Sequence, residues 1–346
     1  MATDATFSFL PLGAIIQTFN VNGINIVQGF PTQELYVKHN SPYFGETIGR
    51  VANRIKGARL DSVNGRAWPL AANNSGNTLH GGNVGWGKRI WQGPTPVGVR
   101  QIPGVDGLQG GESVQFTLVS ADGDEGFPGA LAVSVVYTAG TQPLADGREA
   151  TVLGIEYEAR LVGDGADETV INMTNHSYFN LGGADATTIA GTQVTLHDTQ
   201  YLPVDPTGVP TRGPVAFPGV DVGRPIELGA EAPAFDNCFT TTAEPAAVPV
   251  DTRAGPLRLH LAATHPATGI HLQVLSTEPS FQFYTGDFTD APAVGPGAPA
   301  RGARSAFCCE PGRWVNAPNV PEWKNMTLLR KGETYGARIV YKAWVE

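Results

Sequence analysis

Short strand-like runs recur along the whole chain, and they restrict the fold more than any other feature of the sequence. Apolar and polar residues alternate in residues 113–119, 270–275 and 335–344, for example. A period of two is typical of a β-strand with one buried face. No long stretch has a helical period, and 43 glycines and 27 prolines favour turns over long helices. The sequence therefore predicts an all-β sandwich or barrel.

Other runs of β-forming residues extend this pattern along the chain. We expect strands at residues 7–10, 14–19, 24–27, 35–38, 131–137, 152–161, 169–174, 193–197, 257–261, 280–287 and 306–310. Residues 92–112, rich in proline, glycine and glutamine, are expected to form an exposed excursion. Alternation places His260 and His271 on polar strand faces, so both are expected to be exposed. No linker or internal repeat divides the chain, which predicts one domain spanning residues 1–346.

Charge and cysteine content limit the partners and the compartment. The formal net charge is −9 and the isoelectric point is near 5.3, so nucleic acid is a poor partner. Cys238, Cys308 and Cys309 are too few for a disulfide framework, and their spacing predicts no metal site. The adjacent Cys308 and Cys309 are expected to point to opposite faces of a strand, both buried, in a reducing compartment. No secretory signal is found, and no apolar run approaches the ~20 residues of a membrane helix, which predicts a cytoplasmic protein without membrane contact.

Residues 169–183 combine a strand-like run with many hydrogen-bonding side chains. The run is expected to place His176 at the end of a strand, before a turn at the double glycine 182–183. An imidazole can donate or accept a proton near neutral pH. Its neighbours supply hydroxyl and amide groups, from Asn175, Ser177, Tyr178 and Asn180. This composition suits a polyhydroxy ligand, although a strand-end histidine satisfied by its polar neighbours is the alternative explanation.

Two further stretches carry polar or aromatic side chains between glycines. Residues 41–57 contain Asn53 and Arg54, and a guanidinium fork suits sugar hydroxyls or carboxylates. A loop whose arginines pair with surface acids would look the same. In residues 73–91, His80 precedes two glycines that allow close approach of a ligand. The same stretch contains Trp86 and Trp91, whose rings could stack on a sugar. The alternative is that they belong to a purely structural turn.

Two carboxylates occupy positions that need an explanation. Asp236 lies in an aromatic-rich run, and Glu310 directly follows four apolar residues. A carboxylate in apolar surroundings is costly unless it is paired or functional. An imidazole together with such a carboxylate suits paired acid and base catalysis. The candidate set is therefore Arg54, His80, His176, Asp236, Gln282 and Glu310.

The chain resembles the aldose 1-epimerase family, the galactose mutarotases. The matching segments occur in the family's order across nearly the whole chain, at Gly49–Ile55, Asn77–Gly82, Thr174–Leu181, Leu202–Asp205, Phe235–Asp236, Gln282–Gly286 and Glu310–Pro311. The resemblance implies a large antiparallel β-sandwich, the galactose mutarotase-like supersandwich, with an open sugar cleft. It also implies interconversion of the α- and β-anomers of a free aldose such as galactose or glucose, without a cofactor or a metal.

The same resemblance implies roles for individual residues. Glu310 would be the general base that takes the proton of the C1 hydroxyl, and His176 the general acid that protonates the ring oxygen. His80 matches a second histidine near the ring oxygen and is expected to be a third catalytic residue. Sugar-binding positions of the family are matched by Asn53, Arg54, His80, Tyr178, Asp236 and Gln282. The expected partner is a small-molecule sugar, and the expected assembly is a monomer or a weak homodimer.

The match departs from the family after Glu310. The family usually continues with Pro-Gln and then Pro-Asp-Ala, whereas Gly312, Val315 and Asn316 replace the expected Gln, Pro and Asp in this chain. This loop supports the base, so the departure bears on substrate preference. A non-catalytic sugar-binding module on the same fold is one alternative function. A hexose-6-phosphate 1-epimerase is another, because cations for a phosphate are available at Arg50, Arg54, Lys88 and Arg89.

Overall fold

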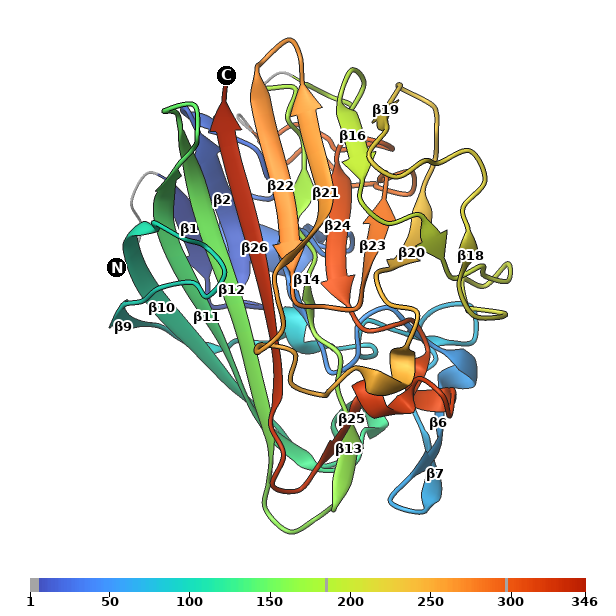
Figure 1. The fold of residues 1–346 in the computed structure, drawn as a ribbon. Helices are drawn as coiled ribbons and strands as arrows, with labels where there is room; N and C mark the ends of the chain where they lie inside the picture. The colour runs from blue at the N-terminus through green and yellow to red at the C-terminus, as the bar shows by residue number, and fades with distance from the viewer. Residues whose placement is uncertain (1–5, 184–185, 296–297) are drawn as a thin grey trace.

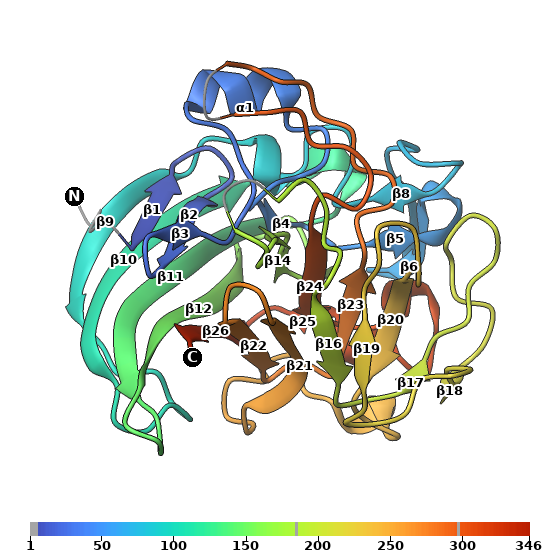
Figure 2. The same cartoon turned by 90° about the horizontal axis from the view of Figure 1, so that it is seen from above.

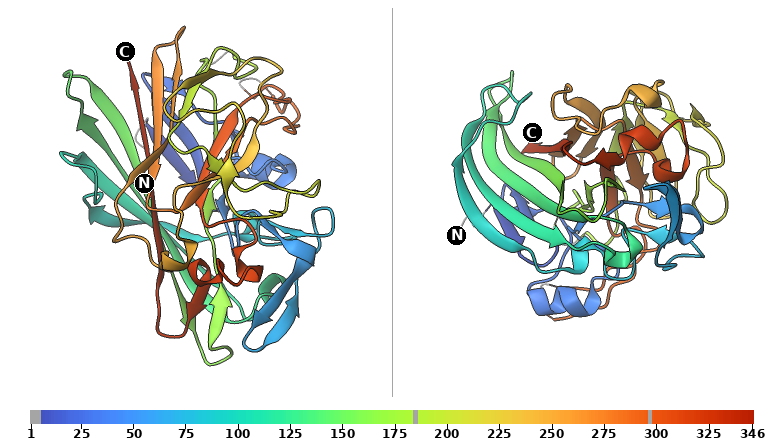
Figure 3. Two further views of the ribbon diagram at one scale, coloured as in Figure 1. Left: turned by 45° about the vertical axis from the view of Figure 1, so that its right-hand side comes forward. Right: turned by 90° about the horizontal axis from the view of Figure 1, so that it is seen from below.

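Two large antiparallel sheets dominate the structure, a computed structural model that describes residues 6–183, 186–295 and 298–346. The larger sheet curves around a small sheet and a strand pair, as Figure 2 and the right-hand view of Figure 3 show. Every ladder between named strands is antiparallel in the part of the chain that the structure describes. The prediction of an all-β antiparallel sandwich is therefore confirmed.

Neighbouring strands in each large sheet often come from distant parts of the chain, as the colours of Figure 1 show. In order of pairing, the nine-stranded sheet consists of β19 (Pro225–Glu227), β16 (Gln193–Leu196), β21 (Arg258–His265), β22 (Ile270–Ser276), β26 (Tyr335–Val345), β12 (Glu149–Val162), β11 (Ala130–Pro143), β10 (Gln109–Ser120) and β9 (Gln92–Val99). The six-stranded sheet, in the same order, consists of β15 (Tyr178–Phe179), β24 (Phe307–Gly312), β23 (Ser280–Tyr284), β20 (Asp236–Thr240), β17 (Gln200–Tyr201) and β18 (Val215–Ala216).

Smaller sheets complete the fold. One has three strands, β1 (Phe7–Leu10), β2 (Ile15–Val21) and β3 (Ile24–Asn25). The strand pairs are β4 (Thr47–Ile48) with β14 (Thr174–Asn175), β5 (Arg54–Ile55) with β8 (Thr78–Leu79), β6 (Arg59–Val63) with β7 (Arg66–Pro69), and β13 (Glu168–Val170) with β25 (Leu328–Arg330). Short 3₁₀ turns lie at Lys56–Ala58, Trp86–Lys88, Asp124–Gly126, Pro245–Ala247, Ala317–Asn319 and Lys324–Met326.

The strand predicted at residues 35–38 is wrong, because this run lies in the helix α1 (Gln33–His39). Glu34 lies in the first turn and Lys38 and His39 lie in the last turn. Their charges interact favourably with the helix dipole and stabilise the helix at both ends. The three β-forming residues in the run are outweighed by this arrangement of charges. The described residues include no helix long and apolar enough to cross a membrane.

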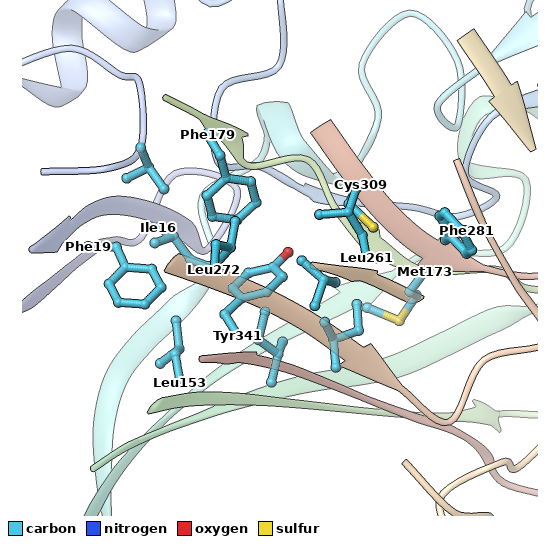
Figure 4. Close-up of a cluster of buried hydrophobic side chains, with 14 of the residues drawn as sticks. Ile16, Phe19, Leu153, Met173, Phe179, Leu261, Leu272, Phe281, Cys309 and Tyr341 are labelled. Carbon is cyan, nitrogen blue, oxygen red and sulfur yellow. The ribbon is translucent and has the colours of Figure 1, made fainter. Parts of the chain in front are cut away.

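The main core is built from the alternating faces of both large sheets and of the three-stranded sheet (Figure 4). In β26, Ile339 and Tyr341 point into this core, whereas Val340 between them belongs to a separate cluster on the other face. Alternation of this kind follows from the geometry of an extended chain. It explains why the strands were the most predictable part of the sequence.

Residues 92–112 are not only an exposed excursion, and that prediction is partly wrong. Residues 92–99 form β9, the last strand of the nine-stranded sheet, which contains Pro94 and Pro96. Ile102, Val105 and Leu108 are buried against the outer face of the large sheet. The apolar residues between the prolines and glycines therefore cover a sheet face that would otherwise meet water.

The predicted exposure of His260 is also wrong, because its side chain is fully buried. The register of β21 against β22 shifts between Leu259 and Leu261, which is the mark of a β-bulge. A bulge breaks the alternation from which exposure was predicted. His260 Nε2 lies 2.6 Å from Ser276 Oγ. His271, the other histidine that was expected to be exposed, is half-buried.

One buried ion pair ties the end of β24 to the large sheet. Arg313 Nη1 lies 3.0 Å from Glu278 Oε2, and both side chains have no exposed surface. Arg313 Nη2 also donates to the carbonyl oxygens of Val250 and Gly336, at 2.9 and 3.3 Å. Removing one charge leaves the other buried without compensation, which is more costly than removing both.

We expect Arg313→Met to lower the free energy of unfolding by roughly 3–5 kcal/mol, because Glu278 is then buried without a partner. The double variant Arg313→Met, Glu278→Leu should recover a large part of that loss. Urea denaturation of the two single variants, the double variant and the parent measures the coupling. Strictly additive losses would contradict the pairing.

Candidate active site

One cavity of about 640 Å³ brings together the eight residues for which the family resemblance implies catalytic or sugar-binding roles. They come from well-separated parts of the chain, and they are Asn53, Arg54, His80, His176, Tyr178, Asp236, Gln282 and Glu310. Most of these side chains are buried or half-buried, while Asp236 is exposed at the cavity. A largely formed, concave site with a few convergent polar groups is the usual form of a small-molecule site.

Neighbouring strands of the six-stranded sheet hold three of the polar side chains. Gln282 of β23 pairs directly with Glu310 of β24, and Asp236 of β20 lies one strand further along. Gln282 Nε2 donates to Asp236 Oδ1 at 2.7 Å. Since cross-strand partners project from the same face, strand register alone places the Gln282 amide beside the Glu310 carboxyl group.

His176 follows β14 and is fixed through its backbone. Its N–H donates to the carbonyl of Glu46 at 2.9 Å, and its own carbonyl accepts from Gly45 at 3.0 Å. The imidazole lies between two tyrosine rings, with centroid distances of 5.7 Å to Tyr43 and 5.1 Å to Tyr178. The ring is therefore held in place before any ligand enters.

His80 is held by reciprocal hydrogen bonds with Asn53. The His80 N–H donates to the Asn53 carbonyl at 3.0 Å, and the Asn53 N–H donates to His80 Nδ1 at 3.3 Å. Both residues have positive φ angles, of 50° and 58°. Because Nδ1 accepts a hydrogen bond, the proton of the neutral ring is on Nε2. Burial lowers the pKa of His80 well below its usual value, which keeps the ring neutral.

A second loop completes the wall around Arg54. Its Nε donates to Asn74 Oδ1 at 3.1 Å, and its Nη1 donates to Asn53 Oδ1 at 3.3 Å. Gly208 approaches the guanidinium so closely that a Cβ there would lie 2.8 Å from Arg54 Cζ. These contacts orient the guanidinium and leave part of it facing the cavity.

The acid and base candidates are in direct contact. His176 Nε2 lies 3.5 Å from Glu310 Oε2, and both side chains are about 5% exposed. Burial raises the pKa of Glu310 well above its usual value, and the charge of Asp236 raises it further. Burial likewise lowers the pKa of His176. Both shifts favour the arrangement in which the two groups are neutral, with one proton on the carboxyl group of Glu310 and a free lone pair on the imidazole.

Some nominated residues have structural roles instead. Trp86 and Trp91 are 1% exposed and pack edge to face in the core, so the structural alternative holds for them and the sugar-stacking one does not. Arg50 is 2% exposed, and its Nη1 donates to the carbonyls of Pro128 and Gly129 at 2.9 Å. Core packing therefore explains the two tryptophans, and hydrogen bonds to backbone carbonyls explain the arginine.

The structure adds residues that sequence reasoning missed. Tyr43 lines the cavity, packs on both histidines and lies under Lys88, whose Nζ is 4.5 Å from the ring centroid. Tyr284 and the highly exposed Phe288 also line the cavity. Tyr284 is two residues from Gln282 and on the same strand face, which could have indicated it. Tyr43 belongs to a loop, so no periodicity indicates it.

Three donor atoms in the cavity have the spacing of a metal site but not the required protonation. Nitrogen and oxygen atoms of His80, His176 and Glu310 lie within 4.8 Å of one another. A histidine that binds a metal through Nε2 donates a hydrogen bond from Nδ1. His80 Nδ1 instead accepts from the Asn53 N–H, so its Nε2 carries the proton. The cluster therefore presents a hydrogen-bond donor where a metal needs a lone pair.

The fold and the site define the class of protein. A large antiparallel sandwich with an open polar cleft, and with an imidazole and a carboxyl group in contact inside it, is what the resemblance to the galactose mutarotases implies. The model of the aldose 1-epimerase family matches residues 2–342. The chain therefore belongs to the aldose 1-epimerase family.

Individual relatives agree with this assignment. The galactose mutarotase of Rattus norvegicus is 37% identical over 327 residues, covering 92% of this chain and 83% of that protein. The bifunctional protein GAL10 of Pachysolen tannophilus is 37% identical over 334 residues, covering 95% of this chain. The chain spans only 44% of the length of that bifunctional relative. A GalM/aldose epimerase homologue from C. elegans has a similar structure, with a TM-score of 0.77, 27% identity and coverage of 98% and 95% of the two chains.

We expect zinc ions added at micromolar concentration at pH 7.5 not to bind in this cavity. Binding would require His80 to move its proton to Nδ1 and to lose the hydrogen bond from Asn53. Isothermal titration calorimetry of the protein and of the Glu310→Gln variant checks this. Stoichiometric zinc binding that is abolished by Glu310→Gln would contradict the assigned tautomer.

Proposed function

We propose that this protein is an aldose 1-epimerase that interconverts the α- and β-anomers of a free aldose such as galactose or glucose. The observation that carries the proposal is the contact of 3.5 Å between His176 Nε2 and Glu310 Oε2 in an open polar cavity. The anomeric hydroxyl and the ring oxygen of an aldose are both bonded to C1. Two groups that are this close can therefore each address one of these oxygens.

In the ring-opening step, the Glu310 carboxylate takes the proton of the C1 hydroxyl. The His176 imidazolium gives its proton to the ring oxygen, the bond from C1 to that oxygen breaks, and a C1 aldehyde forms. Rotation about the C1–C2 bond then exposes the other face of the aldehyde. On closure the roles reverse, with protonated Glu310 as the acid and neutral His176 as the base. The scheme moves only protons, so it calls for no cofactor.

The proton inventory of the pair fits this cycle. Before opening, the proton is on His176, and in the open-chain state it is on Glu310. The two arrangements contain the same number of protons, so transfer across the 3.5 Å contact interconverts them without exchange with solvent. Burial favours the neutral arrangement in the empty cavity, and the charge of Arg54 favours the ionised carboxylate.

The remaining nominated residues would bind and orient the sugar. His80 offers an Nε2–H donor, which suits a substrate oxygen next to His176. Arg54 and Gln282 offer donors, Asp236 offers acceptors, and all three line the cavity. Asn53 and Tyr178 complete this set. The expectations of one domain, a monomer or weak homodimer and a cytoplasmic location stay predictions from the sequence.

The alternative of a hexose-6-phosphate 1-epimerase has less support. Of the four cations nominated for a phosphate, only Arg54 lines the cavity. Arg50 is buried among backbone carbonyls, Lys88 forms an ion pair with Glu46, and Arg89 forms one with Asp124. A phosphate would therefore meet too few free donors to offset the loss of its hydration.

We expect Glu310→Gln to lower enzyme-catalysed anomerisation by roughly 10²–10⁴-fold, because the amide cannot accept the C1 hydroxyl proton. Polarimetry of freshly dissolved α-galactose measures the rate above the spontaneous one. Glu322→Gln, an exposed carboxylate outside the cavity, is the control and should keep the parent rate. An undiminished rate in the Glu310 variant would exclude the assigned base. Saturable sugar binding without any acceleration by the parent would favour a non-catalytic binding module.

We expect free glucose to be a better substrate than glucose 6-phosphate by at least about tenfold in kcat/KM, a difference of about 1.4 kcal/mol. The reason is the shortage of free cations at the cavity. Anomerisation of both sugars, started from the pure α-anomers, gives the ratio. Equal or faster turnover of the phosphorylated sugar would reverse the preference between the two functions.

A further inference from the structure

The two nitrogens of His176 face side chains from the same strand. Nε2 lies 3.5 Å from Glu310 Oε2, and Nδ1 lies 3.7 Å from Cys308 Sγ. Cys308 and Glu310 are two residues apart in β24, so their side chains project from the same face. One strand therefore contacts both sides of the imidazole. The Cys308 contact has no part in the scheme described above.

The neighbouring cysteine has different surroundings. Cys309 projects from the other face of β24 into the main core, where Figure 4 shows it near Leu261 and Tyr341. Cys308 belongs to a separate cluster with Tyr178 and Phe44. Both thiols are fully buried. Two cysteines of equal burial thus lie side by side in sequence, and only one of them contacts the site.

The two histidines of the cavity have different partners at Nδ1. His80 Nδ1 faces the Asn53 N–H, a group that can only donate, so the His80 proton is on Nε2. His176 Nδ1 faces a thiol, whose sulfur can accept a hydrogen bond and whose S–H is only a weak donor, so an Nδ1–H of His176 can be accommodated there. Cys308 is also the cross-strand partner of Tyr178 and packs with it in one cluster, which orients the thiol. This arrangement leaves a sulfur lone pair for an Nδ1–H of His176.

We propose that Cys308 is a positioning residue that holds His176 with a proton on Nδ1, so that Nε2 is the nitrogen that gives and takes the catalytic proton. The inference rests on the proposed function and adds a residue to it. In the cycle, His176 changes from imidazolium to neutral imidazole at Nε2, and Nδ1 stays protonated throughout. The opposite tautomer would have its proton on Nε2 and could not accept one there.

A neutral sulfur suits this position better than a carboxylate would. A carboxylate at Nδ1 stabilises the imidazolium strongly and raises the pKa of the histidine. Burial raises the pKa of the Cys308 thiol well above its usual value, and the nearby Glu310 charge raises it further, so the group stays neutral. The thiol therefore sets the tautomer while adding no charge that would hold the proton on His176.

The test compares Cys308→Ala with Cys309→Ala, because each removes one fully buried thiol from the same strand. We expect Cys308→Ala to lower kcat roughly ten- to a hundred-fold with little change in KM, since partners of this kind orient a histidine without touching the substrate. Cys309→Ala should keep kcat within about twofold of the parent, because its side chain contacts only the core. Cys308→Ser, whose hydroxyl oxygen can accept from Nδ1, should recover most of the lost rate.

Nitrogen-15 NMR of the histidine rings gives a readout that does not depend on turnover. His176, assigned by the loss of its signals in His176→Asn, should have its proton on Nδ1 in the parent and Cys308→Ser proteins at neutral pH. In Cys308→Ala it should be a mixture of tautomers. If Cys308→Ala does not fold, Cys308→Val takes its place, because it fills a similar volume and has no hydrogen-bonding group.

Three results would overturn the inference. They are equal kcat values in the two alanine variants, no recovery of rate by Cys308→Ser, and an unchanged His176 tautomer in Cys308→Ala. Failure of the proposed function gives a different result, because the parent protein then does not accelerate anomerisation at all. A parent that accelerates anomerisation while both alanine variants behave alike would remove only the role of Cys308.

Discussion

The alternation of side chains along β24 is the constraint on which the site depends. Cys309 and Phe307 point into the main core, whereas Cys308 and Glu310 point toward His176. A slip of one residue would bury the carboxyl group in the core and turn a core side chain toward the cavity. The ladders on both sides prevent this, because Gln282 pairs with Glu310 and Tyr178 pairs with Cys308. The packing of the core and the chemistry of the cavity are thus set by one register.

Burial gives the contact between His176 and Glu310 its chemical character. In water a carboxylate and an imidazole at neutral pH would each have its ordinary protonation state. In this cavity the loss of solvation disfavours both charges, which shifts the pair toward the neutral arrangement with the proton on Glu310. A pair that shares one proton can serve as acid in one direction and base in the other. The surrounding tyrosine rings contribute by excluding water from His176.

The sequence was most informative where one physical rule dominates. Strands with a buried face were predictable from alternation, and the site residues from segments that resemble the family. The rule failed at His260, where a bulge interrupts the strand, and at residues 35–38, where charges at both ends favour a helix. Trp86 and Arg50 show the limit of predicting functional residues from sequence. The same residue type, an aromatic ring or a guanidinium, occurs both in a packed core and in a binding site. Only packing distinguishes the two, and packing depends on residues far apart in the chain.

The edges of the nine-stranded sheet have a consequence for the protein at high concentration. The terminal strand β9 contains Pro94 and Pro96, and β19 at the opposite edge begins with Pro225. Proline has no amide hydrogen, so each edge offers an incomplete row of donors to the strand of another molecule. A sheet of this width would otherwise be a template for continued growth. Its prolines thus oppose edge-to-edge aggregation of newly made chains, a hazard that the interior of the sandwich does nothing to reduce.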